Sequence, residues 1–261
     1  MAARPELTWR LAAGYSAWMA VLAAGYFARP DWHLVTWGLI GLSCVGGIIA
    51  GIVLYRPARI WPWLLLAAAN LAYSSGDTVY NVLTTYFGAV NPFPSAADVL
   101  YLATYPLFAI GLAGFNRYRT GRDLGAVIDA LIVTGGVGLL SWVFLIQPLR
   151  AEHDPLNRIT AMAYPLGDVL MLLMLARLVF SPDGTRNPSV RLLTIGTAGI
   201  LGSDVAYGLL QLNGHWAVGS AIDVGWLLFY WAWGWPPCGR RWWASPSNYH
   251  PGRPVCCRCP G

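Results

Sequence analysis

Eight runs of apolar residues follow one another along this chain, separated only by short segments that contain Arg, Pro, Asn or Asp. Each run has about 20 residues, which as an α-helix rising ~1.5 Å per residue crosses a hydrocarbon layer of ~30 Å. The runs cover residues 7–27, 34–55, 61–83, 96–115, 124–148, 159–180, 190–212 and 218–235. The segments between them are too short to build a core of their own. We therefore predict an all-α, polytopic membrane protein with about eight transmembrane helices in one domain, residues 1–235.

The composition excludes an ordinary soluble domain. Only 11% of the residues are charged and 56% are hydrophobic, whereas a soluble domain carries roughly 25% charged residues. So little charge cannot cover a water-facing surface. The first run is long enough to span and more runs follow it, so we expect an anchor there rather than a cleaved signal peptide.

The distribution of arginine predicts the orientation. All 17 basic residues are Arg, and with the N-terminus inside only Arg29, Arg150 and Arg158 fall in outer loops, which leaves 14 on the inner side. Short cytoplasmic loops retain positive charge, so both termini are predicted to be cytoplasmic, in the cell (plasma) membrane. The arginines lie in short loops rather than on one folded face, so no nucleic-acid partner is expected.

Two stretches about 125 residues apart resemble each other. Residues 95–105 read SAADVLYLATY and residues 220–230 read SAIDVGWLLFY, with six of eleven positions identical. The preceding spans also match, as DTVY at 77–80 and DVAY at 204–207. A shift of four helices preserves direction in the membrane, so these matches predict a parallel four-plus-four repeat. The alternative is that short Asp and aromatic patterns recur by chance.

Six of the twelve acidic residues fall inside predicted spans: Asp77, Asp98, Asp129, Asp168, Asp204 and Asp223. A charged side chain at mid-bilayer costs at least about 2.5 kcal/mol, so each needs a partner, water or a proton. We expect them to face the bundle interior. By their depth in the predicted spans, four lie in the outer half, while Asp129 and Asp168 lie deeper and are interpreted as structural.

The four outer acids define the candidate site. We predict an outward-opening, aromatic-lined polar cavity that binds a small cationic or hydrogen-bonding ligand. Its predicted residues are Asp77, Tyr80, Asp98, Tyr101, Asp204, Tyr207, Asp223 and Trp226. Two alternatives stay open. In the first, Asp98 and Asp223 only cap helices, because each follows a serine, Ser95 or Ser220, at capping-box spacing. In the second, Asp77 and Asp204 only make interhelical hydrogen bonds.

No phosphate-binding loop, nucleophile elbow or zinc-protease motif occurs in the sequence, so we predict no catalysis and no cofactor in this chain. His33, His153 and His215 fall in predicted outer loops without metal-ligand spacing, so no metal site is predicted. After Trp235 the sequence becomes rich in Pro, Cys, Arg and Trp. Residues 236–261 are therefore interpreted as an irregular cytoplasmic tail. Their composition is that of a frameshifted end of the coding sequence. The competing interpretation is a zinc knuckle.

Several motifs resemble a known family, the multi-span N-terminal region of actinobacterial cyclic di-GMP signalling proteins. The motifs are NPFPSAADVLYL at 91–102 with Tyr105-Pro106, DALI at 129–132 and YPLGD at 164–168. In that family the region precedes diguanylate cyclase (GGDEF) and often phosphodiesterase (EAL) domains, and it resembles a sensory input module. This chain carries no cyclase motif, so the resemblance does not imply cyclase activity here.

Together these features predict an integral membrane sensory module without an output domain. The alternatives are a small-molecule transporter with an intramembrane acidic site and a non-catalytic membrane scaffold. The expected partners are the lipid bilayer and a small ligand from the outer side, and a homodimer is left open.

Overall fold

The computed structural model describes residues 5–57, 59–90, 92–116, 124–147, 154–180, 188–212 and 219–235. The predicted tail, residues 236–261, lies outside this part of the chain. Within it the regular structure is entirely helical, and the eight α-helices are α1 (Pro5–Ala28), α2 (His33–Tyr55), α3 (Trp61–Tyr86), α4 (Ala96–Asn116), α5 (Leu124–Ser141), α6 (Pro155–Val179), α7 (Pro188–Leu212) and α8 (Asp223–Gly234). A short 3-10 helix, η1 (Pro30–Trp32), leads into α2, and a π-helical turn, η2 (Trp142–Ile146), continues α5. The all-α prediction is confirmed.

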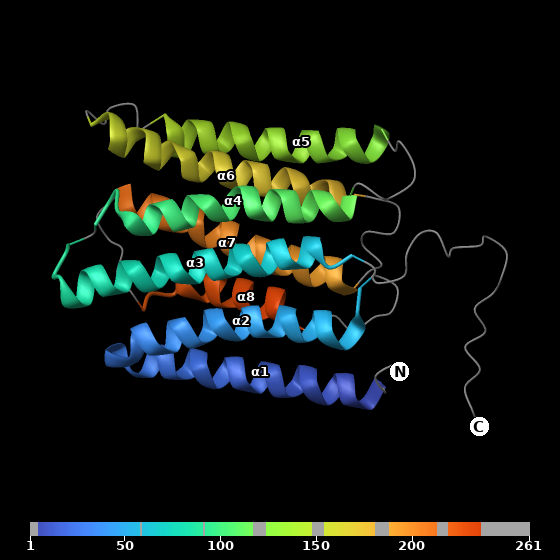
Figure 1. Ribbon diagram of the computed structural model, residues 1–261. Coiled ribbons are helices and arrows are strands. Elements are labelled where there is room, and N and C mark those ends of the chain that lie inside the picture. Colours follow the sequence, from blue (N-terminus) through green and yellow to red (C-terminus); the bar gives the residue numbers. More distant parts are fainter. Residues whose placement is uncertain are drawn as a thin grey trace, which may run out of the picture.

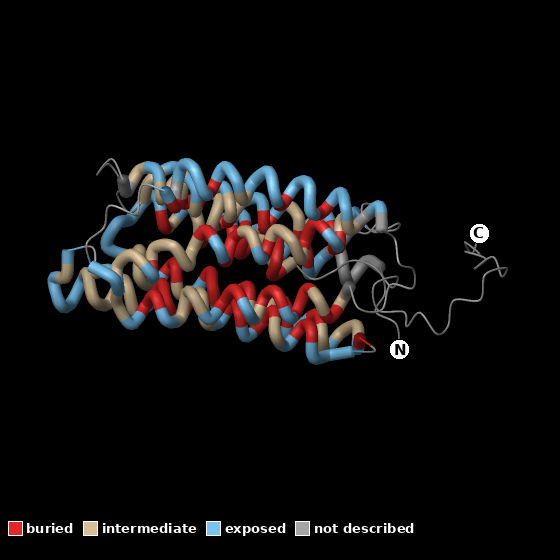
Figure 2. Tube along the Cα trace, turned by 90° about the horizontal axis from the view of Figure 1, so that it is seen from above, coloured by how far each residue is buried: buried red, intermediate tan, exposed pale blue. Residues whose placement is uncertain are grey.

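The protein is membrane-embedded, as its long apolar helices indicate. In the described residues six helices are long and apolar enough to cross a bilayer; they contain the segments Arg10–Ala28, Pro30–Tyr55, Ala96–Phe115, Val127–Phe144, Pro155–Val179 and Ser189–Leu210. Exposed residues follow the outside of the bundle (Figure 2). Many of the exposed residues are large and apolar, such as Val53 (65% exposed), Ile132 (66%) and Leu139 (69%). Soluble monomers rarely expose apolar patches larger than a few hundred Å².

The helices lie side by side with nearly parallel axes, and α1 and α5 occupy opposite edges of the bundle (Figure 1). Neighbours in sequence pack together from α1 to α4, and α4 then packs on α6. The last helix, α8, packs against both α2 and α7. This arrangement places α8 among helices from both halves of the chain.

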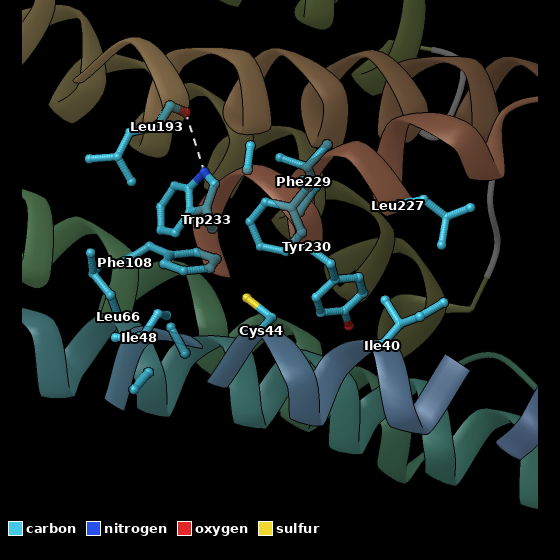
Figure 3. Close-up of a cluster of buried hydrophobic side chains, with 14 of the residues drawn as sticks. Ile40, Cys44, Ile48, Leu66, Phe108, Leu193, Leu227, Phe229, Tyr230 and Trp233 are labelled. Carbon is cyan, nitrogen blue, oxygen red and sulfur yellow. Dashed lines mark hydrogen bonds between the residues drawn. The ribbon is translucent and has the colours of Figure 1, made fainter. Parts of the chain in front are cut away.

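The core gathers around α8 (Figure 3). Phe229 and Tyr230 are fully buried, and the ring centroid of Trp233 lies 4.5 Å from that of Phe108 on α4. The indole N–H of Trp233 donates to the carbonyl oxygen of Leu193 on α7 at 3.2 Å. The buried residues of α8 are Asp223, Leu227, Phe229, Tyr230, Ala232, Trp233 and Gly234, so most of this helix is enclosed by its neighbours.

Glycines allow the closest helix contacts. A Cβ atom built on Gly47 of α2 would lie 2.0 Å from the carbonyl oxygen of Gly234, and one built on Gly199 of α7 would lie 2.5 Å from that of Gly225. Small residues let helix backbones approach in this way in membranes. These contacts set the position of α8 against α2 and α7.

Two of the eight predicted spans, α3 and α8, are not among these six helices. The first, α3, has 26 residues but includes the polar residues Asn70, Ser74 and Asp77 among its buried positions. The second was predicted to begin at Val218, but α8 begins at Asp223 and has 12 residues, about 18 Å of helix at ~1.5 Å per residue. A turn precedes it because Gly219 has a φ of +85° and its N–H donates to the Asp223 carboxylate at 2.7 Å.

Candidate functional site

Asp77 on α3 lies at the centre of a hydrogen-bond network between helices. Its carboxylate accepts from the indole N–H of Trp37 (2.6 Å), the hydroxyl of Tyr101 (2.8 Å) and the hydroxyl of Tyr230 (2.7 Å). These donors come from α2, α4 and α8. A buried carboxylate is costly unless hydrogen bonds replace its lost hydration. Asp77 therefore joins four helices through one side chain.

Asp204 on α7 lies in a related environment. It accepts from the indole N–H of Trp226 on α8 at 2.8 Å. It also interacts electrostatically with the carboxyl group of Asp168 on α6. The Tyr105 hydroxyl on α4 donates to Asp168 at 2.9 Å. Four helices thus meet at these two acids.

Asp98 caps α4 and also reaches a distant helix. The Ser95 N–H donates to its carboxylate at 2.6 Å, while the Ala97 N–H donates to the Ser95 hydroxyl at 3.2 Å. This is the reciprocal arrangement of a capping box. The Tyr164 hydroxyl on α6 donates to the other carboxylate oxygen at 2.5 Å. Capping is therefore correct for Asp98 but is only part of its contacts.

Asp223 at the start of α8 also reaches a distant helix. It accepts from the Gly219 N–H and, at 2.6 Å, from the Tyr26 hydroxyl on α1. The Tyr26 ring stacks on His33 with centroids 4.4 Å apart, and His33 lies close enough to Asp223 to interact electrostatically. The buried Ser220 hydroxyl makes no hydrogen bond. Asp223 thus ties α8 to α1 and to the preceding turn, but no side-chain hydrogen bond caps α8.

The structure brings most of the predicted site residues into one region. Asp77 interacts electrostatically with Asp204 and Asp223. Tyr207 lies 6.0 Å from Trp226 between ring centroids, and it interacts with Tyr80. Asp98 is linked to the region through its interactions with Tyr80 and Tyr207. Asp77 and Asp204 do make interhelical hydrogen bonds, so that alternative is confirmed as a description of their contacts.

Exposure divides the region into two parts. Asp77, Asp98, Asp168 and Asp223 are buried. The residues that are partly exposed are Tyr80, Tyr101, Tyr164, Asp204, Tyr207 and Trp226. Asp204 is the one acid of the network in this second group.

The two acids interpreted from sequence as structural have different environments. Asp129 is exposed on α5. Asp168 is buried, accepts from the Tyr105 hydroxyl and interacts electrostatically with Asp204, so it belongs to the network. Sequence reasoning missed it because depth along a span does not reveal which way a side chain points around the helix.

Sequence reasoning also missed most of the aromatic donors. The repeat pairs Tyr105 with Tyr230, both of which donate to buried acids, so that signal was present. Tyr164 was singled out only as part of a motif. Nothing in the sequence marks Trp37 or Tyr26 apart from the other aromatic residues. Of the histidines in predicted outer loops, His33 packs on Tyr26, whereas His153 and His215 lie outside the described residues.

Comparison with models of protein families, with curated proteins and with solved structures finds no match to this chain. The function is therefore argued from the site itself and from the sequence motifs.

Proposed function

We propose that this chain is the sensory input module of a signalling protein of the plasma membrane, and that it binds a small cationic or hydrogen-bonding ligand from the outer side. The observation that carries the proposal is the network of five carboxylates whose donors come from α1, α2, α4, α6 and α8. A ligand cation that replaced one aromatic donor would change contacts among several helices at once. The resemblance to cyclic di-GMP signalling proteins supports the signalling role.

The surroundings of the partly exposed Asp204 suit a cation. The aromatic faces of Tyr80, Tyr207 and Trp226 are part of the same region, and aromatic faces attract cations, most strongly when water is excluded. Asp204 with Asp168 supplies negative charge. Amines and quaternary ammonium compounds are therefore the ligand class that the proposal favours.

Matched contacts support a parallel four-plus-four repeat with eight spans. Tyr101 on α4 donates to Asp77 on α3 at 2.8 Å, and Trp226 on α8 donates to Asp204 on α7 at the same distance. The packing is matched as well, since α4 packs on α6 and α8 packs on α2. The site then lies between two halves, as in proteins built from parallel repeats.

Eight spans predict a strict alternation of reporter fusions. Fusions after Arg56 and Asn116 are expected to report the cytoplasm, and fusions after Gly88 and Asp154 the outer side. Gly88 is decisive because it follows α3, the polar helix. A cytoplasmic signal at Gly88 would show that α3 does not cross the membrane and would contradict the eight-span topology.

The sensory role predicts ligand-dependent output from a chimera. Residues 1–235 joined to a diguanylate cyclase domain are expected to change cyclic di-GMP production when choline or another small amine is added outside. Asp204→Asn is expected to weaken this response about tenfold, or ~1.4 kcal/mol, and the matched control Asp129→Asn to leave it unchanged. A chimera insensitive to every amine tested, or an equal effect of the two variants, would refute the sensory proposal.

A transporter is the second candidate, favoured by the partial exposure of Asp204 between the proposed halves. It predicts flux of the same amines in proteoliposomes, reduced by Asp204→Asn. A sensor predicts binding without flux. The same purified protein therefore separates the two functions.

A further inference from the structure

The two helices at the edges of the bundle each have a face that no other described helix covers. α1 packs on η1, α2 and α8, whereas α5 packs on α6 and on the π-helical turn η2. The two helices lie at opposite edges of the bundle (Figure 1). The buried residues of each helix face its neighbours, so its opposite side points away from the bundle.

The outward faces of these two helices have complementary shapes. The face of α1 is a stripe of exposed residues three or four positions apart, Arg10, Gly14, Ala17, Val21, Ala24 and Ala28. The matching stripe on α5 is Gly125, Asp129, Ile132, Gly136 and Leu139. This spacing is typical of helices that pack along one another. Small residues dominate the α1 stripe and let helix backbones approach closely in membranes, so it fits the larger Ile132 and Leu139 of α5.

Each stripe carries one charged residue, and the two charges lie at the same depth. Arg10 is five residues after the first residue of α1, and Asp129 is five residues after the first residue of α5. That distance is ~7.5 Å along each helix. Both helices begin at the same end of the bundle (Figure 1). The other exposed arginines of the described α-helices, Arg177 and Arg191, lie within three residues of a helix end.

The signs of these charges select the partner of each face. Asp129 is exposed within the apolar segment Val127–Phe144, and an acid that faces lipid is costly unless it meets a cation or another donor. A two-fold contact between two copies of α5 would bring Asp129 to Asp129, and one between two copies of α1 would bring Arg10 to Arg10. A contact of α1 with α5 brings opposite charges together, and their attraction is stronger beside lipid than in water.

We propose that copies of this chain assemble head to tail in the membrane. The outward face of α1 in one copy packs on the outward face of α5 in the next, and Arg10 pairs with Asp129. Because each copy has one face of each kind, the contact repeats from copy to copy until a ring closes. Neither face includes a residue of the network of five carboxylates. Assembly is therefore independent of the ligand, and Asp129 variants that disturb it are expected to retain the ligand response.

Disulfide crosslinking of the full chain in native membranes tests this arrangement. The parent protein has serine in place of the tail cysteines, Cys238, Cys256, Cys257 and Cys259. Ala17→Cys and Gly136→Cys each place a thiol twelve residues after the first residue of their helix. Copies with Ala17→Cys and differently tagged copies with Gly136→Cys are expected to crosslink when expressed together, and neither is expected to crosslink with itself.

The matched control is Leu42→Cys, on the exposed side of α2, expressed together with Gly136→Cys. It is expected to give no crosslink, because α2 contributes no residue to the proposed interface. Three results would each overturn the proposal: no crosslink between Ala17→Cys and Gly136→Cys copies, an equal yield with Leu42→Cys, or crosslinking of Gly136→Cys copies with one another. The last result would indicate a two-fold contact through α5.

A charge exchange between the two tagged copies tests the pairing of Arg10 with Asp129. Arg10→Asp in the Ala17→Cys copy is expected to lower the crosslinking yield about tenfold, and so is Asp129→Arg in the Gly136→Cys copy. Both substitutions together, one in each copy, are expected to restore the yield, which loss of folding in either copy could not do. An undiminished yield after a single reversal, or no recovery in the combination, would contradict the pairing.

Discussion

Asp77→Ala is expected to lower the free energy of unfolding by about 2–4 kcal/mol. Interhelical hydrogen bonds in membranes are worth about 0.6 kcal/mol on average, up to about 1.7, and Asp77 accepts three of them. Alanine also leaves Trp37, Tyr101 and Tyr230 without their acceptor, and each unsatisfied buried donor costs about 1–3 kcal/mol, although not additively. The effect should appear in unfolding by denaturing detergent.

The control for this variant is Asp129→Ala. Asp129 is exposed on α5, and surface changes away from special features are usually within about 0.5 kcal/mol. Asp77→Asn should fall between the two, because an amide oxygen accepts two hydrogen bonds but not three. Equal stabilities of the two alanine variants would mean that the network around Asp77 does not hold the helices together.

Gly47→Val is expected to separate α2 from α8 and to destabilise the bundle by about 3 kcal/mol, the upper end of the usual range for overpacking. The added Cβ would lie 2.0 Å from the Gly234 carbonyl oxygen. Backbone cannot move aside as a flexible side chain can. Because α8 carries Trp226 and Tyr230, its displacement should also break the hydrogen bonds to Asp204 and Asp77. Detergent unfolding and size-exclusion profiles would measure the loss.

The neighbouring Gly46→Val is a matched control for this clash. Nothing lies within 4 Å of a Cβ atom built on Gly46, and the residue is exposed. The two variants share composition and helix, so only the contact with α8 differs. If both had the same stability, the close approach of α2 and α8 would not be a stabilising feature of the fold.

Much of the fold follows from the sequence because the length of an apolar run is a local property. The predicted boundaries of the first four runs agree with α1 to α4 within about three residues, which is the usual margin for such boundaries. The start of α8 was missed. It depends on Gly219 and on the Asp223 carboxylate that accepts its N–H, and neither feature changes the hydrophobic pattern.

The candidate site was predictable only where the repeat carried the signal. Matching the two Asp and aromatic motifs brought Tyr101 to Asp77 and Trp226 to Asp204. This match could not reveal Trp37 or Tyr26, because both residues lie outside the matched motifs. Nor could it reveal Asp168, since a span-length pattern contains no information about which neighbour an inward side chain meets.

The sequence by itself determined that the chain forms long apolar helices in a membrane and that several acids must lie inside the bundle, because the costs of burying charge and exposing apolar groups depend only on residue type and run length. The tertiary structure alone decided which donor each acid meets. That choice depends on the rotation and lateral order of the helices, which close contacts such as Gly47 with Gly234 determine. The hydrogen bond from the Tyr105 hydroxyl to Asp168 is a consequence that no linear pattern contained.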